Sequence, residues 1–174
     1  MASIIKVDQI QTAAGGTPTA ADLGITGSVI QVVRGTYGTE VESSSSSYAD
    51  TGLSVDITVK DASSTIYGFI TAPMQLTKPA SNQDVGTSIK VLRDSTAVYT
   101  PATSFENYHF FNNTITTNTR FHYTNTFADT HGQTKGSTLT YKTQFNSYNT
   151  TSGVHIRHCF NSNIATLMLI EIAG

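Results

Sequence analysis

The chain has 174 residues, enough for one domain with a hydrophobic core. Charged residues make up 13% of it, the net charge is −2 and the Lys and Arg residues are scattered, so the basic surface that nucleic-acid binding requires is not expected. Uncharged side chains supply the polarity instead, and the abundant Thr is β-branched and suits the half-solvated face of a strand. The composition therefore predicts an all-β protein.

Residues 1–27 differ in pattern from the rest of the chain. Ile4, Val7 and Ile10 recur every three residues, whereas Ile5 and Val7 alternate as in a strand, so the period is ambiguous. Two interpretations stay open for this apolar segment. It packs against its own domain, or it is a docking peptide that holds the domain to a larger assembly.

The end of this first segment carries signals for a short helix. Thr17 and Pro18 offer an N-cap and a first-turn proline, and Gly24 offers a stop, which predicts a helix over residues 19–23. The chain start lacks the basic residues and long apolar stretch of a signal peptide, so we expect the protein to be made and folded in a cytoplasm.

Strand patterns begin after residue 27. Residues 29–33 are apolar on both faces, which predicts an interior strand, and residues 53–60 alternate, which predicts one face in the core and one in water. Residues 88–93 and 96–99 flank Asp94-Ser95 and predict a hairpin. We therefore expect a one-domain head over residues 28–174.

Residues 163–174 are almost continuously apolar. The run is too short to span a bilayer, which needs about 20 apolar residues, so no membrane insertion is expected. It should be buried as a central strand or at a contact between subunits. With roughly nine strands separated by polar turns, the pattern predicts a β-sandwich or jelly roll. The residues expected in the core or at a subunit contact are Val29, Val32, Leu53, Val55, Ile57, Leu167, Leu169, Ile170 and Ile172.

Catalytic motifs do not stand out in this sequence. It has no Gly-rich phosphate loop, no nucleophile-elbow pattern and no Cys-x-x-Cys, so we expect neither enzyme activity nor a cofactor. The single cysteine, Cys159, excludes an internal disulfide and is expected to be buried and inert. His155 and His158 would point to opposite faces of a strand and could not chelate one metal, although a histidine ring around a symmetry axis stays open.

Aromatic and amide side chains are interleaved between residues 108 and 123. Rings can stack on the apolar faces of sugars while amides and guanidinium groups form hydrogen bonds, so this region is a candidate receptor or glycan surface. The alternative is that Phe110 and Phe121 belong to the core and only their neighbours face solvent. The surface residues proposed are Tyr108, His109, Phe111, Asn112, Asn113, Arg120, His122 and Tyr123.

Residues 5–11, 27–33 and 165–174 resemble a family of tail-fibre-like virion structural proteins of tailed bacteriophages, chiefly of the marine and cyanobacterial type. Residues 53–58 and 88–96 fit the same layout, so the resemblance spans almost the whole chain. It implies a β-rich head displayed on a short N-terminal attachment segment. In that segment Ile4, Ile5, Val7 and Ile10 would contact other virion proteins.

The resemblance also implies location and partners. It places the protein in the virion, as a homotrimer, because a closed assembly buries apolar surface that a single chain would expose. A short tail fibre or fibre tip that touches a host surface glycan is the first function implied. A head or tail decoration protein without a receptor is the alternative.

Overall fold

The computed structural model describes residues 18, 23, 25–80, 82–103, 106–111 and 114–174. The predicted attachment residues Ile4, Ile5, Val7 and Ile10 lie outside this range, as does most of the helix expected over residues 19–23.

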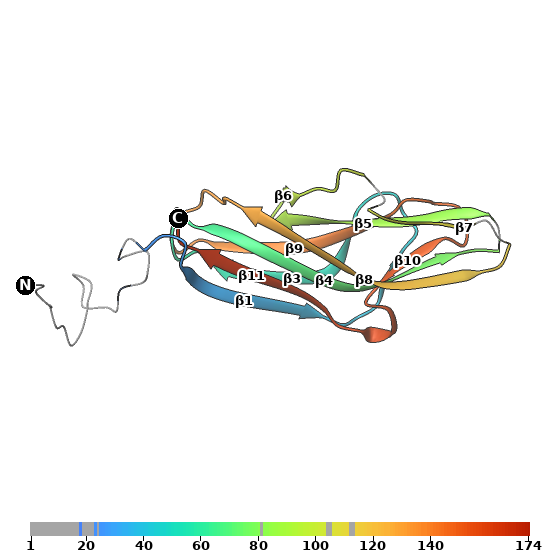
Figure 1. Ribbon diagram of the computed structural model, residues 1–174, viewed down its shortest axis with the longest axis horizontal. Coiled ribbons are helices and arrows are strands. Elements are labelled where there is room, and N and C mark those ends of the chain that lie inside the picture. The colour runs from blue at the N-terminus through green and yellow to red at the C-terminus, as the bar shows by residue number, and fades with distance from the viewer. Residues whose placement is uncertain (1–17, 19–22, 24, 81, 104–105, 112–113) are drawn as a thin grey trace, which may run out of the picture.

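The described residues form two antiparallel sheets that pack face to face (Figure 1). In chain order the strands are β1 (Val29–Tyr37), β2 (Val41–Ser43), β3 (Ala49–Thr58), β4 (Thr65–Lys78), β5 (Gln83–Arg93), β6 (Thr96–Tyr99), β7 (Asn107–Phe111), β8 (Thr117–Asp129), β9 (Thr138–Ser147), β10 (His155–His158) and β11 (Ala165–Ile172). Sheet A contains β1, β2, β4, β8, β10 and β11, and sheet B contains β3, β5, β6, β7 and β9.

The strand pairs are nested along the chain. β1 pairs with β11, β2 with β10, β3 with β9, β4 with β8 and β5 with β7, as if one long hairpin had been rolled up. The two outer pairs, β1–β11 and β2–β10, both lie in sheet A, and the inner pairs β3–β9, β4–β8 and β5–β7 then alternate between sheets B, A and B. This nested pairing across two sheets is the connectivity of a jelly roll. The fold is therefore an all-β jelly-roll sandwich, which confirms the predicted fold class.

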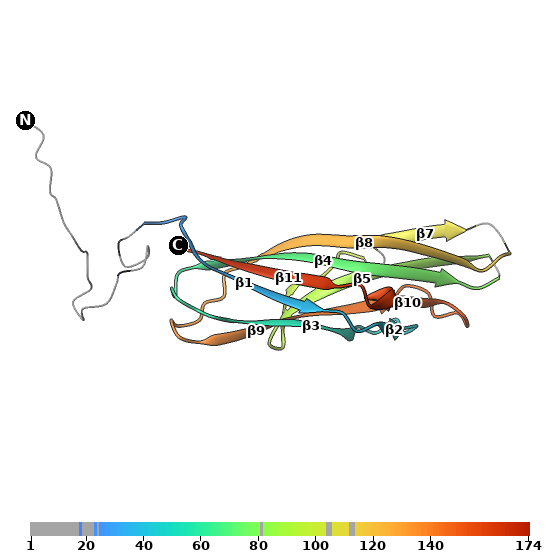
Figure 2. The ribbon, with the colours of Figure 1, turned by 90° about the horizontal axis from the view of Figure 1, so that it is seen from below.

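The sandwich is long and narrow, with most strands running along its long axis (Figures 1 and 2). At one end, here called the proximal end, Gly27 N donates to Ala173 O at 2.9 Å and Ala173 N donates to Ser28 O at 2.9 Å. The opposite, distal end holds β7 and the start of β8. The chain thus enters and leaves the sandwich at the same end.

Strand β11 lies between β1 and β4 in sheet A. Leu167 and Leu169 point inward and are fully buried, while Met168, Ile170 and Ile172 alternate with them and are half-buried on the other face. The apolar run of residues 163–174 therefore contains a central strand, β11. This is one of the two positions expected for the run.

Strand β1 departs from expectation. The interior position predicted for residues 29–33 is wrong, because β1 pairs with β11 on one side and forms an edge of sheet A. Val29 and Val32 point away from the core and are 58% and 55% exposed. Strand β1 is therefore apolar on both faces and still lies at a sheet edge. Its outer face, with Val29 and Val32, is uncovered in the single chain.

The core fills the space between the two sheets. Leu53, Val55 and Ile57 alternate with exposed polar residues along β3 and are 8% exposed or less. Gly68 on β4 makes room for the ring of Phe127, because a Cβ at this position would lie 2.0 Å from a ring atom. Phe127 in turn stacks on Tyr141 of β9, with ring centroids 5.8 Å apart, so aromatic packing joins sheet A to sheet B.

Candidate functional site

The outer face of sheet A carries side chains in ranks that cross neighbouring strands, because residues directly opposite each other share a face. One rank joins Val32, Ile170, Tyr67 and Ala128, and the next joins Arg34, Met168, Phe69 and Thr126. The apolar members of these ranks, with Val29 and Ile172 beside them, form what we call the apolar outer face: Val29, Val32, Tyr67, Phe69, Met168, Ile170 and Ile172.

The apolar outer face is exposed to water although its side chains are large and apolar. Tyr67 and Phe69 are each 41% exposed, which is high for large side chains in the middle of a sheet. Arg34 is the one charged residue in the two ranks. A contiguous apolar surface of this kind is typical of a protein contact.

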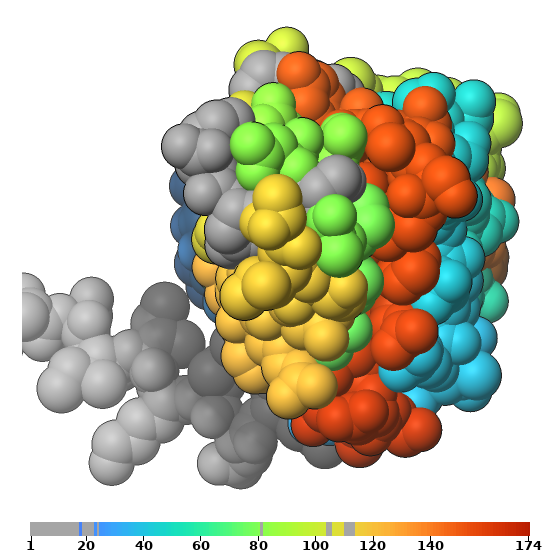
Figure 3. Space-filling view, turned by 90° about the vertical axis from the view of Figure 1, so that its right-hand side faces the viewer, coloured from blue at the N-terminus to red at the C-terminus, as the bar shows by residue number. Residues whose placement is uncertain are grey.

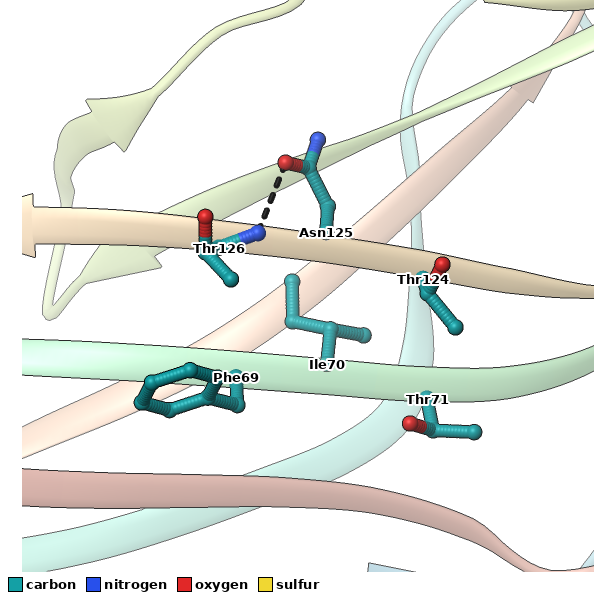
Figure 4. A pocket seen from close by; sticks show the side chains of 6 residues that line it. All are labelled: Phe69, Ile70, Thr71, Thr124, Asn125 and Thr126. Atoms are coloured by element: carbon teal, nitrogen blue, oxygen red, sulfur yellow. Dashed lines mark hydrogen bonds between the residues drawn. The ribbon is translucent and has the colours of Figure 1, made fainter.

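A shallow depression of about 380 Å³ lies over β4 and β8 at one side of this face. Figure 4 shows its lining, which consists of Phe69, Ile70, Thr71, Thr124, Asn125 and Thr126. The Asn125 side chain accepts a hydrogen bond from Thr126 N at 2.7 Å. None of the lining residues is ionisable, so the depression continues the uncharged character of the face.

The outer face of sheet B has the opposite character. Asp50 accepts hydrogen bonds from Gln144 Nε2 at 2.7 Å and from Lys142 Nζ at 2.9 Å, and these bonds lower the pKa of Asp50. Asp56 accepts a hydrogen bond from Thr140 Oγ1 at 2.6 Å. This face is charged and hydrated.

The predicted receptor surface is divided among different faces of the sandwich. Tyr108 is exposed on β7, whereas His109 is half-buried and faces Phe121 with ring centroids 6.3 Å apart. Arg120 and His122 are exposed on the outer face of sheet A, where Arg120 Nε donates to Gln75 Oε1 at 2.9 Å. Asn112, Asn113 and the side chain of Phe111 lie outside the part that the structure describes.

Tyr123 requires a correction, because it is buried rather than exposed to a receptor. It follows the inward parity of β8, and its hydroxyl donates to Glu106 Oε2 at 2.5 Å and accepts a hydrogen bond from Asn125 Nδ2 at 3.0 Å. Burial and the neighbouring Glu106 raise the pKa of Tyr123 above its ordinary range. Glu106 also accepts a hydrogen bond from Tyr99, and nothing in the sequence pattern pointed to this cluster.

Sequence reasoning also missed Tyr148, which follows β9. Its ring makes an edge-to-face contact with Tyr108, with centroids 5.8 Å apart and planes at 75°. Both rings are near 40% exposed. The usable signal was an aromatic residue inside a loop of Ser, Asn and Thr, which places a ring where loops meet solvent.

A polar cluster at the proximal end joins Glu171, Ser64 and His131. The fully buried Glu171 carboxylate accepts hydrogen bonds from Lys60 N at 2.9 Å, Asp61 N at 3.0 Å and Ser64 Oγ at 2.7 Å, and from the Gln31 side chain. The carboxylate thereby fastens the loop between β3 and β4 to β11.

Ser64 and His131 do not have the geometry of a nucleophile and its base. His131 Nδ1 accepts a hydrogen bond from Gln133 N at 2.9 Å, so the ring proton resides on Nε2, 3.0 Å from Ser64 Oγ. In this tautomer His131 Nε2 donates a hydrogen bond to Ser64 Oγ. Nε2 then has no lone pair with which to accept the proton of the Ser64 hydroxyl.

The two histidines of β10 lie on opposite faces. His155 is partly exposed near Glu42, with 3.9 Å between Nδ1 and Oε1, whereas His158 is fully buried and its pKa is lowered to about 4 by burial. Cys159 is also buried, and burial raises its pKa. Among the described residues, no three His, Cys, Asp or Glu side chains gather as metal ligands.

None of the helices in the described part of the chain is long and apolar enough to cross a bilayer. The sequence matches no family model and no curated protein.

Among solved structures, the chain is similar to dimeric latent PorU from Porphyromonas gingivalis, with TM-score 0.32 and 10% identity, covering 95% of this chain and 14% of that one. It is also similar to the infectious bursal disease virus Gt strain structure, with TM-score 0.26 and 10% identity over 84% of this chain and 41% of that chain. The D431N mutant VP2 protein of that virus gives a TM-score of 0.24 and 14% identity, covering 83% of this chain and 36% of that chain. The chain spans less than half of each structure, and at these TM-scores the likenesses carry no conclusion on function.

Proposed function

We propose that the chain is a structural protein of a bacteriophage virion, best suited to a short tail fibre or fibre tip. In this proposal the jelly roll is a displayed head without catalytic activity, and residues 1–27 attach it to other virion proteins. The observation that carries the proposal is the contrast between the outer faces of the two sheets. A sandwich with one apolar and one hydrated outer face is suited to a symmetric assembly.

The proposed partner for the apolar outer face is a second and third copy of the same chain, giving a homotrimer. The face has few charges to desolvate, and Val32 and Ile170 extend it to the edge strand, where a neighbouring copy would have access. Burying apolar area favours association by about 25 cal/mol for each Å² removed from water, against which stands the entropy lost when the copies join.

Light scattering on the purified full chain tests this assembly. We expect a stable trimer at micromolar concentration and a monomer for Val32→Lys, because the new charge would be buried at the contact. Ser54→Lys is the matched control, since Ser54 is an exposed outward residue on β3, the edge strand of sheet B. A monomeric wild type, or equal dissociation of both variants, would refute the proposed contact.

Attachment is tested separately in virions. Deleting residues 1–24 leaves every described strand intact, so we expect a folded head that no longer joins particles. Incorporation of the truncated protein would contradict the attachment role. A density map of the particle distinguishes a fibre from a shell decoration by position alone.

A further inference from the structure

Tyr108 and Tyr148 form an exposed aromatic pair near the distal end, here called the distal tyrosine pair. They come from β7 and from the loop after β9, and they flank the same residue of β5. Tyr108 is opposite Gly86 in the register, and Tyr148 N donates to Gly86 O at 2.9 Å. Because Gly86 has no side chain, nothing on β5 at this position projects between the two rings.

Hydrogen bonds hold the loop that carries Tyr148. Ser147 N donates to Ser45 O at 2.8 Å, and Ser147 Oγ donates to Asn149 O at 2.7 Å. Asn149 Nδ2 donates to Gln83 Oε1 at 2.9 Å and to the main-chain oxygen of Asp84 at 3.0 Å. The backbone that carries Tyr148 is therefore held in place before any ligand arrives, which reduces the entropy lost on binding.

Polar groups lie on both sides of the sequence segments that carry the pair. The carboxylate of Asp84 on β5 raises the pKa of the Tyr108 hydroxyl, through hydrogen bonding and through its negative charge. The exposed serines at positions 45–47 lie beside the loop after β9, and Figure 3 shows these two segments side by side at the distal end. Rings beside a carboxylate and hydroxyl groups match a pyranose, which has an apolar C–H face and a rim of hydroxyl groups.

We propose that the distal tyrosine pair is a binding site for a neutral, pyranose-containing glycan. The sugar face would stack on the exposed rings, and Asp84 would accept hydrogen bonds from its hydroxyl groups. The carboxylate disfavours acidic sugars through like-charge repulsion. This site deepens the proposed function, since it rests on display of the head toward a cell surface.

Saturation-transfer NMR with the full chain and the methyl pyranosides of glucose, mannose and galactose tests the site. Binding of the corresponding neutral polysaccharides is then measured by calorimetry. We expect transfer to at least one neutral sugar and none to glucuronic acid. Tyr148→Ala should weaken binding by about tenfold, since the stacking surface is lost, whereas Tyr148→Phe should retain most of it.

Ile164→Ala is the control, because Ile164 is a large apolar side chain that is 64% exposed and belongs neither to the distal tyrosine pair nor to the apolar outer face. It should leave sugar binding unchanged. No transfer from any neutral sugar, or equal binding by Tyr148→Ala, overturns the glycan site. Light scattering on the same samples shows whether the assembly proposal fails as well, so the two failures are distinguishable.

Discussion

The two sheets of this jelly roll share one core but present different faces to the outside. Sheet A shows Val32, Tyr67 and Phe69, whereas sheet B shows an ion pair between Lys142 and Asp50 with 2.9 Å between Nζ and Oδ2. Both faces are built by the same alternation of inward and outward residues. The outward positions, which the core does not constrain, therefore carry the information about what the protein contacts.

The largest effect is expected where the two faces of one strand are compared. Leu167→Ala should lower the free energy of unfolding by about 4 kcal/mol, because it opens a cavity among fully buried side chains. Met168→Ala on the outer face should lower it by less than about 1 kcal/mol in the monomer. Denaturant unfolding in the Val32→Lys background measures both. Equal losses would mean that the outer face is already packed in the single chain.

The buried acidic residue Glu171 and the exposed acidic residue Asp56 should differ in their effect on stability. Glu171→Ala should lower the free energy of unfolding by about 3 kcal/mol, because Lys60 N and Asp61 N lose their acceptor in a buried site. Asp56→Ala on the outer face of sheet B should change it by less than about 0.5 kcal/mol. Thermal or urea unfolding of both variants checks this. A small effect at Glu171 would show that water replaces the carboxylate.

Acid should destabilise the inner side of sheet A through His158. The pKa of this residue is about 4 in the folded chain, below its ordinary value of 6.5. The unfolded chain therefore takes up the proton first as the pH falls. The folding stability that depends on neutral His158 is fully present above about pH 6.5. At most roughly 3 kcal/mol of it is lost as the pH falls to 4.

Unfolding free energies measured between pH 7 and 4 test the His158 effect. His158→Gln should flatten the part of the pH dependence that belongs to this residue. His155→Gln is the control, because His155 is partly exposed on the other face of β10, and it should keep the slope. A slope unchanged by His158→Gln would assign the acid sensitivity to other groups.

The smallest effect is expected on the hydrated face of sheet B. Asp50→Asn removes the ion pair with Lys142, in which the Asp50 side chain is 54% exposed. Such pairs contribute little, so the loss should stay below about 0.5 kcal/mol and shrink further at high salt. Urea unfolding at low and high salt measures it. A larger, salt-independent loss would show that this face is also desolvated.

Several parts of the fold follow from local sequence. The alternation at Leu53, Val55 and Ile57 and the hairpin around Asp94 were predictable, because strand periodicity and turn chemistry are local properties. Asp94 takes a left-handed conformation with φ of 53°, which Asp tolerates in a turn. The nested pairing of distant strands could not be predicted from the sequence, because the pattern within one strand does not specify which other strand it pairs with.

Local sequence was sufficient for the all-β class and for the inward residues of β3, because the two-residue period of a strand separates its faces. It limited the apolar run of residues 163–174 to two positions, a central strand or a contact between subunits. Tertiary contacts place β1 at a sheet edge, bury Tyr123 while Tyr108 stays exposed, and bring Tyr148 against Tyr108. Each of these depends on contacts between segments far apart in the chain. Periodicity assigns a side chain to one of two faces, and only packing decides which face meets water.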